Sequence, residues 1–171
     1  MSQKPENQHL PEGVTLRPMV PDDLTVVVAL EQRLFPLDAW PARMFGDELA
    51  QPSRSYLILE HDHHGIIGYS GLMCLPPVAD VQTIAVIPEW EGHGLGTALM
   101  RALLEEAHQR GATEVLLEVR EDNPRAQQLY LRFGFVHIHT RPRYYRDGTG
   151  AWVMRLELDA VTTQDKKQEI S

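Results

Sequence analysis

The sequence of 171 residues has little cysteine and no long apolar run. Cys74 is the only cysteine, so an internal disulfide is excluded and a reducing, cytoplasmic location is expected. No apolar run approaches the roughly 20 residues that a membrane-spanning helix needs. The polar residues 1–12 contain no hydrophobic signal-peptide core. We therefore expect no membrane partner.

Positive charge is also scarce. The chain has 16 Lys and Arg against 24 Asp and Glu, which gives a formal net charge of -8. A protein that binds nucleic acid through its surface needs the opposite balance, so direct nucleic-acid binding is not expected. An anionic ligand would have to be held by local geometry, because the overall field of the protein repels it.

The sequence does contain alternating strand and helix patterns sufficient for one domain. Its length and its 43% hydrophobic content fit one globular domain. That domain is expected over residues 13–159, between flexible polar tails at residues 1–12 and 160–171. Hydrophobic periodicity predicts the order β-α-α-β-β-β-α-β-α-β-β. This order indicates an α/β fold of the α+β kind, a mixed sheet with one strand–helix–strand crossover at its centre.

Three glycines, Gly92, Gly94 and Gly96, stand between a predicted strand and a predicted helix, in the stretch "EWEGHGLGTALM". Glycines there let backbone amides approach a phosphate, and the helix dipole adds partial positive charge. A nucleotide P-loop is excluded because no lysine follows the last glycine. A dinucleotide-binding fingerprint is disfavoured because Leu99 stands where its third glycine should be. A pyrophosphate-binding helix start and a turn that merely begins a helix both remain.

Two motifs resemble the GNAT superfamily of N-acyltransferases. The stretch "TIAVIPEWEGHGLGTALMRALLEEA" is similar to the acetyl-CoA loop of that family, and "LEVREDNPRAQQLYLRFGF" is similar to its second signature. The resemblance spans about Val14 to Leu158. The runs "LEVR", "RYY" and "FP" are most similar to the RimI type, the ribosomal-protein alanine N-acetyltransferases, which modify the N-terminus of a small-subunit ribosomal protein. The resemblance implies a GNAT-like fold, acetyl-CoA as co-substrate, and the N-terminal alanine of a ribosomal protein as acceptor.

The same resemblance assigns the residues that hold acetyl-CoA. In the family the strand before the glycines splays away from its parallel neighbour and leaves its amides free. Asn123 is expected to cap the following helix, and in the family this asparagine also contacts the cofactor. The cofactor-binding residues implied are Ile84, Ala85, Val86, Gly92, His93, Gly94, Leu95, Gly96, Thr97 and Asn123.

Glu91 departs from the family pattern, which has Gln or Arg at this position. A carboxylate facing the pyrophosphate would repel it. We therefore expect the Glu91 side chain to point to solvent, and a Glu91→Gln change to leave acetyl-CoA affinity almost unchanged.

Glu118 and Tyr130 are the candidate catalytic residues. An α-amino group has a pKa of roughly 8, so a base of modest strength suffices to deprotonate it. Glu118 matches the glutamate assigned as base in RimI-type enzymes; the alternative is a solvated carboxylate at a strand end. The resemblance implies that the Tyr130 hydroxyl protonates the departing CoA sulfur; the alternative is a core tyrosine.

Four residues resemble the peptide-clamping residues of N-terminal acetyltransferases: Phe35, Pro36, Tyr144 and Tyr145. No metal is expected. The histidines of "HDHH" at residues 61–64 have no second ligand cluster, and the pair His137 and His139, which spacing places on one strand face, is too small for a zinc site.

Two other functions stay open from the sequence. A GNAT enzyme could acetylate a small-molecule amine, such as a polyamine or an aminoglycoside. The chain could also be a non-catalytic acyl-CoA-binding module, although both Glu118 and Tyr130 are present.

Overall fold

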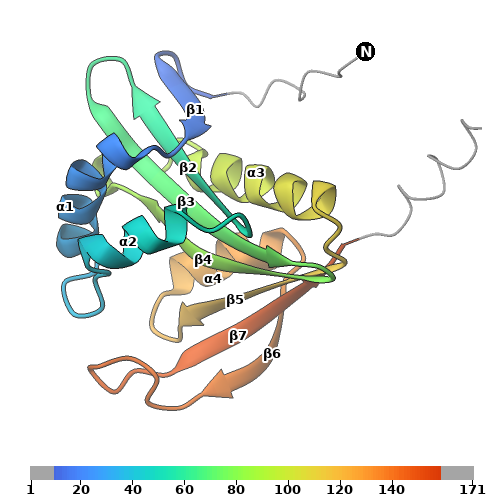
Figure 1. Cartoon of the computed structure of the whole chain (residues 1–171). Helices are drawn as coiled ribbons and strands as arrows, with labels where there is room; N and C mark the ends of the chain where they lie inside the picture. The colour runs from blue at the N-terminus through green and yellow to red at the C-terminus, as the bar shows by residue number, and fades with distance from the viewer. Residues whose placement is uncertain (1–9, 159–171) are drawn as a thin grey trace, which may run out of the picture.

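The computed structural model describes residues 10–158, which form a seven-stranded mixed sheet with two α-helices on each face (Figure 1). The strands and helices follow the predicted order, which confirms the mixed α/β fold. The elements are β1 (Val14–Pro18), a 3-10 turn (Pro21–Asp23), α1 (Leu24–Leu34), α2 (Ala42–Leu49), β2 (Arg54–His61), β3 (Gly65–Leu75), β4 (Val78–Val86), a second 3-10 turn (Pro88–Trp90), α3 (Leu95–Gln109), β5 (Glu114–Arg120), α4 (Pro124–Arg132), β6 (Val136–Arg141) and β7 (Ala151–Glu157).

The ends of the chain fall only partly within the described residues. Residues 1–9 and 159–171, which include most of the two expected tails, lie outside them. Leu10 is partly buried against the apolar group that contains Val14 and Leu59. Packing of the domain therefore begins before residue 13.

The sheet has the strand order β1-β2-β3-β4-β5-β7-β6. All neighbouring strands are antiparallel except β4 and β5, which are parallel and joined by α3. A parallel pair requires a crossover connection, and here the helix supplies it. The predicted single crossover at the centre of the sheet is confirmed.

The parallel strands β4 and β5 diverge soon after they start. They pair only at Val78 with Glu114, Ala79 with Val115, and Asp80 with Leu116. Beyond Asp80, β4 keeps its pairing with β3 alone. The splay that the family resemblance implied is therefore present, and it leaves one edge of residues 81–86 without a partner strand.

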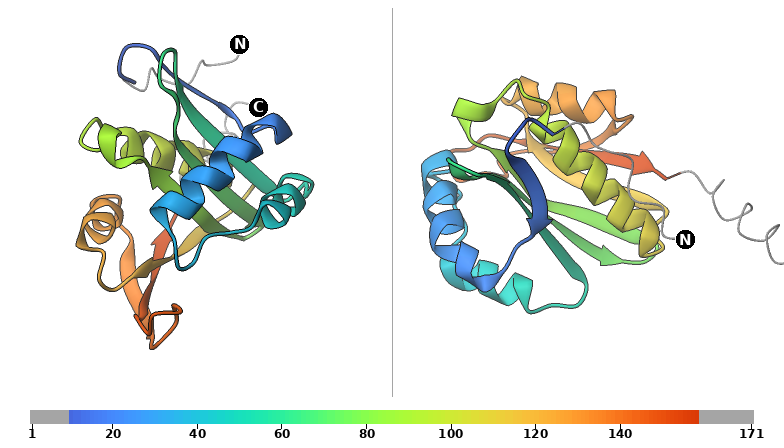
Figure 2. Two further views of the ribbon diagram at one scale, coloured as in Figure 1. Left: turned by 90° about the vertical axis from the view of Figure 1, so that its left-hand side faces the viewer. Right: turned by 90° about the horizontal axis from the view of Figure 1, so that it is seen from above.

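Apolar side chains cover both faces of the sheet. Helices α1 and α2 pack on one face, and α3 and α4 pack on the other (Figures 1 and 2). Buried side chains on the first face include Val27, Phe45 and Tyr69, and those on the second include Leu99 and Leu103. Among the described helices none is long and apolar enough to cross a membrane.

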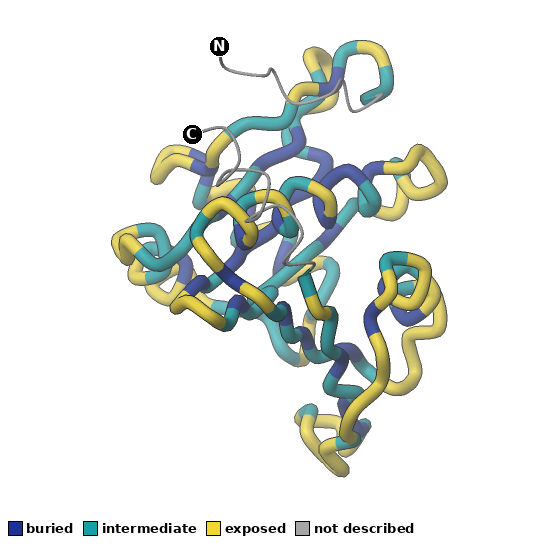
Figure 3. The backbone as a smooth tube through the Cα atoms, turned by 90° about the vertical axis from the view of Figure 1, so that its right-hand side faces the viewer, coloured by how far each residue is buried: buried dark blue, intermediate teal, exposed yellow. Residues whose placement is uncertain are grey.

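Burial is concentrated in the central strands, whereas β6 and the loop that follows it are mostly exposed (Figure 3). Strand β6 lies at the edge of the sheet and pairs with β7 alone. The loop between them, residues 142–150, projects from this end of the molecule (Figure 1).

A register shift in β6 overturns one expectation. His137 is opposite Met154 and His139 is opposite Val153, which are consecutive residues of β7. Consecutive residues of a strand face opposite sides, so the two histidines lie on opposite faces and not on one. His137 instead stacks on Trp152, with ring centroids 4.3 Å apart.

Candidate functional site

A cavity of about 620 Å³ lies where β4 and β5 diverge, between the start of α3, the helix α4 and the α1–α2 loop. The predicted site residues that line it are Phe35, Ile84, Ala85, Val86, Gly92, Gly94, Leu95, Gly96, Thr97, Glu118, Asn123, Tyr130 and Tyr145. Segments far apart in the sequence therefore converge on one space. Three predicted residues, Pro36, His93 and Tyr144, are not part of its lining.

At one end of the cavity the glycine loop presents a helix N-terminus. Gly92 and Gly94 have φ values of 80° and 75°, a left-handed conformation that favours glycine. Gly94 precedes α3, and the first helical hydrogen bond runs from the amide of Ala98 to the Gly94 carbonyl at 3.0 Å. The amides of residues 95–97 come before that bond, so they have no partner within the helix. Such a loop can bind a phosphate group.

The His93 side chain contacts the backbone of the residues that precede it in the glycine loop. Its Nδ1 lies 3.0 Å from the carbonyl oxygen of Trp90 and 3.1 Å from that of Glu91. The imidazole therefore braces the loop backbone. His93 therefore contacts the backbone of the loop and does not line the cavity.

Glu91 lines the cavity, and its carboxylate is paired. Its Oε2 lies 3.1 Å from Nη1 of Arg125 in the first turn of α4. The Glu91 side chain is 40% exposed, so it does reach solvent, but it also forms a bridge from the glycine loop to α4. The sequence motifs did not reveal Arg125, because nothing in them shows that these two segments meet.

Glu118 lies on the partly buried face of β5 and lines the cavity. Residues 114–120 alternate between partly buried and buried, and Glu118 belongs to the partly buried set. Its Oε1 lies 3.3 Å from Nε of Arg141 in β6. A hydrogen bond with Glu118 raises the pKa of Tyr144, so this tyrosine contacts the carboxylate although it does not line the cavity.

A second carboxylate lies close to Glu118 on the same part of the sheet. Burial, followed by the negative charges of Glu118 and Glu114, raises the pKa of Asp80. Asp80 is the last residue at which β4 and β5 pair. Glu118 lines the cavity and Asp80 lies close to it, so this part of the sheet is acidic, which favours a cationic partner such as a protonated amine.

Tyr130 is a buried residue of α4 that lines the cavity, with 6% of its surface exposed. Its ring packs edge-on against Phe135, with centroids 6.1 Å apart. Burial raises the pKa of the Tyr130 hydroxyl well above its usual value. The hydroxyl is therefore a neutral hydrogen-bond donor throughout the physiological pH range.

The cavity also contains a buried carboxylate that sequence reasoning missed. Glu31 in α1 is 3% exposed and lines the cavity. It accepts a hydrogen bond of 2.5 Å from the Tyr69 hydroxyl and one of 3.4 Å from the Trp40 amide. Its position one turn after the buried Val27 places it on the apolar stripe of α1, which is the signal that could have found it.

Asn123 performs the capping role expected of it. Its side-chain Oδ1 accepts a hydrogen bond of 3.2 Å from the amide of Ala126. Proline at the next position fits the first turn of the helix. The cap fixes the start of α4 beside the glycine loop, and Asn123 itself lines the cavity.

Within residues 10–158 no group of three or more His, Cys, Asp or Glu side chains is placed to hold a metal ion. The histidines at residues 61–64 pack against aromatic neighbours. The ring centroid of His61 lies 4.9 Å from that of Trp90, and that of His64 lies 5.7 Å from it.

Comparisons with known proteins agree with this arrangement. Residues 24–135 match the acetyltransferase (GNAT) family. The chain is 39% identical over 150 residues to the N-alpha-acetyltransferase RimI of Mycobacterium tuberculosis, with 84% of this chain and 92% of that protein covered. It is 35% identical over 141 residues to a putative ribosomal protein bS18-alanine N-acetyltransferase of Bacillus subtilis, with 81% and 92% covered.

Other relatives differ in length or in name. The chain is 38% identical over 152 residues to an uncharacterized protein of Mycobacterium leprae and spans 41% of its length. It is 30% identical over 152 residues to a mycothiol acetyltransferase of Saccharomonospora viridis, with 79% of this chain and 50% of that protein covered.

A solved structure agrees in both fold and sequence. The ribosomal-protein-S18-alanine N-acetyltransferase from Escherichia coli has a TM-score of 0.76 and 28% identity, with 85% of this chain and 94% of that chain covered. The matched family model covers more than half of the chain, including the glycine loop and α4. The chain is an N-acetyltransferase that belongs to the GNAT family.

Proposed function

We propose that the chain is an Nα-acetyltransferase that transfers acetyl from acetyl-CoA to the N-terminal amine of a protein, with a ribosomal protein starting with alanine as the acceptor. The observation that carries this proposal is the shape of the cavity. One end has a helix N-terminus suited to a pyrophosphate, and the other end is formed by two loops around Glu118. The relatives named RimI and bS18-alanine N-acetyltransferase support the choice of acceptor.

The residues present fit acetyl-CoA. The amides of residues 95–97 would bind its pyrophosphate, and the unpaired edge of β4 from Val81 to Val86 would hydrogen-bond its pantetheine arm as a neighbouring strand does. The backbone there also offers donors to the thioester carbonyl oxygen, on which negative charge develops during attack by the amine.

Glu118 would receive the proton that the attacking amine loses. Its Oε1 lies 3.3 Å from Nε of Arg141, an ion pair that fixes the position of the carboxylate in the lining of the cavity. Because an α-amine has a pKa of roughly 8, deprotonation near neutral pH is only slightly uphill. A water molecule between Glu118 and the amine would serve equally well.

Tyr130 would act on the leaving sulfur. The raised pKa of its hydroxyl makes complete proton transfer to a thiolate more unfavourable than it would be for an ordinary tyrosine. A hydrogen bond that stabilises the developing charge is therefore the better description of its contribution.

Transfer to a small-molecule amine is the second candidate. The relative named mycothiol acetyltransferase supports it, because its name describes a small-molecule acceptor. The carboxylate of Glu118 in the cavity lining, with that of Asp80 close to it, would suit a polyamine as well as a protein N-terminus.

One experiment separates these functions. The protein is incubated with acetyl-CoA and a panel of peptides beginning with Ala, Ser, Met or Gly, and separately with polyamines, aminoglycosides and thiol-containing amines, and the products are identified by mass spectrometry. We expect acetylation of the N-terminus of Ala-starting peptides. Acetylation of small amines alone would contradict the protein acceptor, and acetyl-CoA binding without any product would indicate a non-catalytic binding module.

A further inference from the structure

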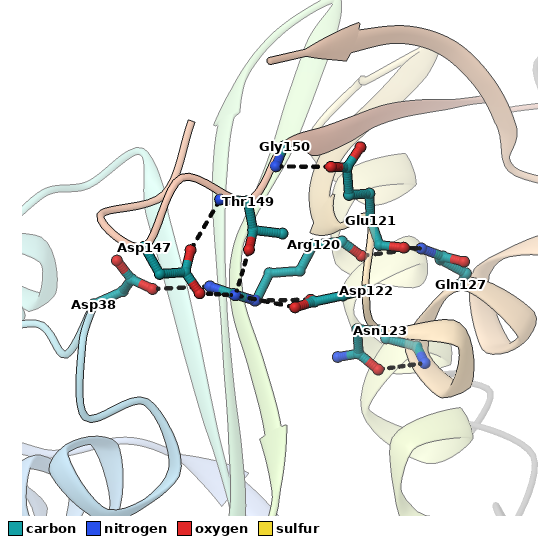
Figure 4. Close-up of polar contacts among 10 residues, drawn as sticks. Asp38, Arg120, Glu121, Asp122, Asn123, Gln127, Asp147, Thr149 and Gly150 are labelled. Carbon is teal, nitrogen blue, oxygen red and sulfur yellow. Dashed lines mark hydrogen bonds and ion pairs between the residues drawn. The ribbon is translucent and has the colours of Figure 1, made fainter. Parts of the chain in front are cut away.

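Arg120 lines the cavity, and its side chain lies where three chain segments meet (Figure 4). Arg120 is the last residue of β5, two positions after Glu118. Its Nη1 lies 3.3 Å from Oδ2 of Asp38 in the α1–α2 loop. Its Nη2 donates hydrogen bonds to Asp147 and, at 3.0 Å, to Oγ1 of Thr149, both in the β6–β7 loop.

Further contacts fix the plane of the guanidinium. Asp122 accepts from Nε at 3.0 Å and from Nη2 at 3.2 Å, a two-pronged contact from the β5–α4 loop. The guanidinium carbon also lies 4.8 Å from the centre of the Tyr145 ring, in cation–π contact. Only arginine has a planar set of donors that can serve several carboxylates at once.

Three carboxylates surround the single positive charge of Arg120. One guanidinium faces the carboxylates of Asp38, Asp122 and Asp147. Its hydrogen bonds lower the pKa of Asp122 and lower that of Asp147 to about 2, so both are ionised at neutral pH. Without Arg120, carboxylates from separate loops would face one another and repel.

We propose that Arg120 is a positioning residue whose guanidinium joins the α1–α2 loop to the β6–β7 loop and so sets the width of the opening through which the acceptor enters. This inference rests on the proposed function, since the two loops carry Phe35 and Tyr145, which line the acceptor end of the cavity. The Arg120 carbonyl, which a substitution keeps, accepts from the Asn123 amide at 3.1 Å, whereas the guanidinium contacts the two loops. Loss of the guanidinium should therefore act on the acceptor more than on acetyl-CoA.

The test uses Arg120→Gln in the full chain, with Arg155→Gln as the matched control. Arg155 also pairs with two carboxylates, Glu114 at 2.5 Å and Glu157 at 3.1 Å, but at the other end of β5 and outside the cavity. Amide hydrogen exchange of residues 35–41 and 142–150 is measured without substrates, and KM and kcat are measured for an Ala-starting peptide and for acetyl-CoA.

For Arg120→Gln we expect faster exchange in both loops and a peptide KM raised about tenfold, with the KM for acetyl-CoA changed less than about twofold. For Arg120→Lys, the exchange rates and the peptide KM should lie between those of the wild type and those of Arg120→Gln, because an ammonium keeps the charge but loses the planar donors. Arg155→Gln should match the wild type in both measurements.

Unchanged exchange in both loops, or equal increases in the two KM values, would overturn the inference. If the wild type acetylates no peptide, the proposed function fails and the specific effect on a peptide acceptor fails with it. The exchange measurement needs no acceptor, so it still decides whether Arg120 holds the loops together.

Discussion

At the scale of single residues, the environment of Tyr130 determines what its hydroxyl can do. The phenol is buried and its pKa is raised. We expect Tyr130→Phe to lower kcat about 10- to 1,000-fold, because one hydrogen bond to developing charge is lost. The affinity for acetyl-CoA, measured by calorimetry, should stay nearly unchanged.

The opposite pattern for Tyr130→Phe would assign a structural role to this residue. A large loss of acetyl-CoA affinity at unchanged kcat would mean that the ring shapes the cavity and that the hydroxyl takes no part in the reaction. The thermal midpoint of unfolding serves as the control, because the ring and its packing against Phe135 are retained in the variant.

Glu91 is the residue for which the structure changes the expectation most. The sequence alone predicts that Glu91→Gln leaves acetyl-CoA affinity unchanged. In the structure this substitution would release Arg125, whose guanidinium lies at the rim of the cavity that would hold the pyrophosphate. We now expect Glu91→Gln to tighten acetyl-CoA binding about two- to fivefold at low salt, since exposed charges contribute modestly.

Two further measurements test the pairing of Glu91 with Arg125. Calorimetry at high salt should reduce the gain, because the charges are exposed and therefore screened. In an Arg125→Gln background, Glu91→Gln should tighten binding less than it does alone. An equal gain in both backgrounds would show that Glu91 itself repels the phosphates, without any contribution from Arg125.

At the scale of elements, helix α4 runs from its ion pair with the glycine loop to the candidate catalytic residue Tyr130. It starts at the Asn123 cap, passes Arg125 and carries Tyr130. Loss of the cap in Asn123→Ala should cost about 1 kcal/mol of unfolding free energy. The thermal midpoint, measured by circular dichroism, should fall about 2–4 °C for a chain of this size.

The serine variant separates the two roles of Asn123. Serine also caps helices, so Asn123→Ser should keep most of the stability that Asn123→Ala loses. If the asparagine also contacts acetyl-CoA, both variants should raise the KM for acetyl-CoA. A rise in the alanine variant alone would mean that the cap is the whole of its contribution.

Local patterns predicted the order of elements, and most of the site residues that the family resemblance named line one cavity. In the structure Glu118 is a partly buried residue of β5 and Tyr130 is a buried residue of α4. Other features of the strands depend on pairing between strands, which local patterns do not show. Strand β4 begins at Val78, where its first residues pair with both β3 and β5. The bulge in β6 likewise depends on register with β7, which spacing along one strand does not reveal.

The parts of the site that could not be predicted depend on contacts between distant segments. Arg125 meets Glu91, and Arg120 meets Asp38 and Asp147, across long stretches of chain. From the sequence alone, each of these charged side chains is expected to be an ordinary exposed residue. Their pairing follows only once the sheet has brought the loops together.

At the scale of the whole molecule, Glu31 links α1 to β3 and to the α1–α2 loop through Tyr69 and the Trp40 amide. Burial raises the Glu31 pKa above its ordinary value of 4.5, and the bonds from Tyr69 and Trp40 only partly oppose this. The folded chain therefore holds this proton to a higher pH than the unfolded chain does. Stability is lost as pH rises from about the ordinary glutamate value through the raised one. The loss is about 1.4 kcal/mol for each pH unit that separates the folded and unfolded pKa values.

Glu31→Gln removes that ionisation while keeping groups that can bond to Tyr69 and Trp40. We expect the variant to gain stability relative to the wild type as pH rises from 4 to 8, measured as the difference in unfolding free energy from urea titrations at each pH. A difference that does not change over this range would mean that Glu31 ionises as readily in the folded chain as in the unfolded one. Glu31 lines the cavity, as Glu118 does, so its charge above the raised pKa makes the lining more negative. The KM of the acceptor should therefore respond to the same pH interval in the wild type and not in the variant.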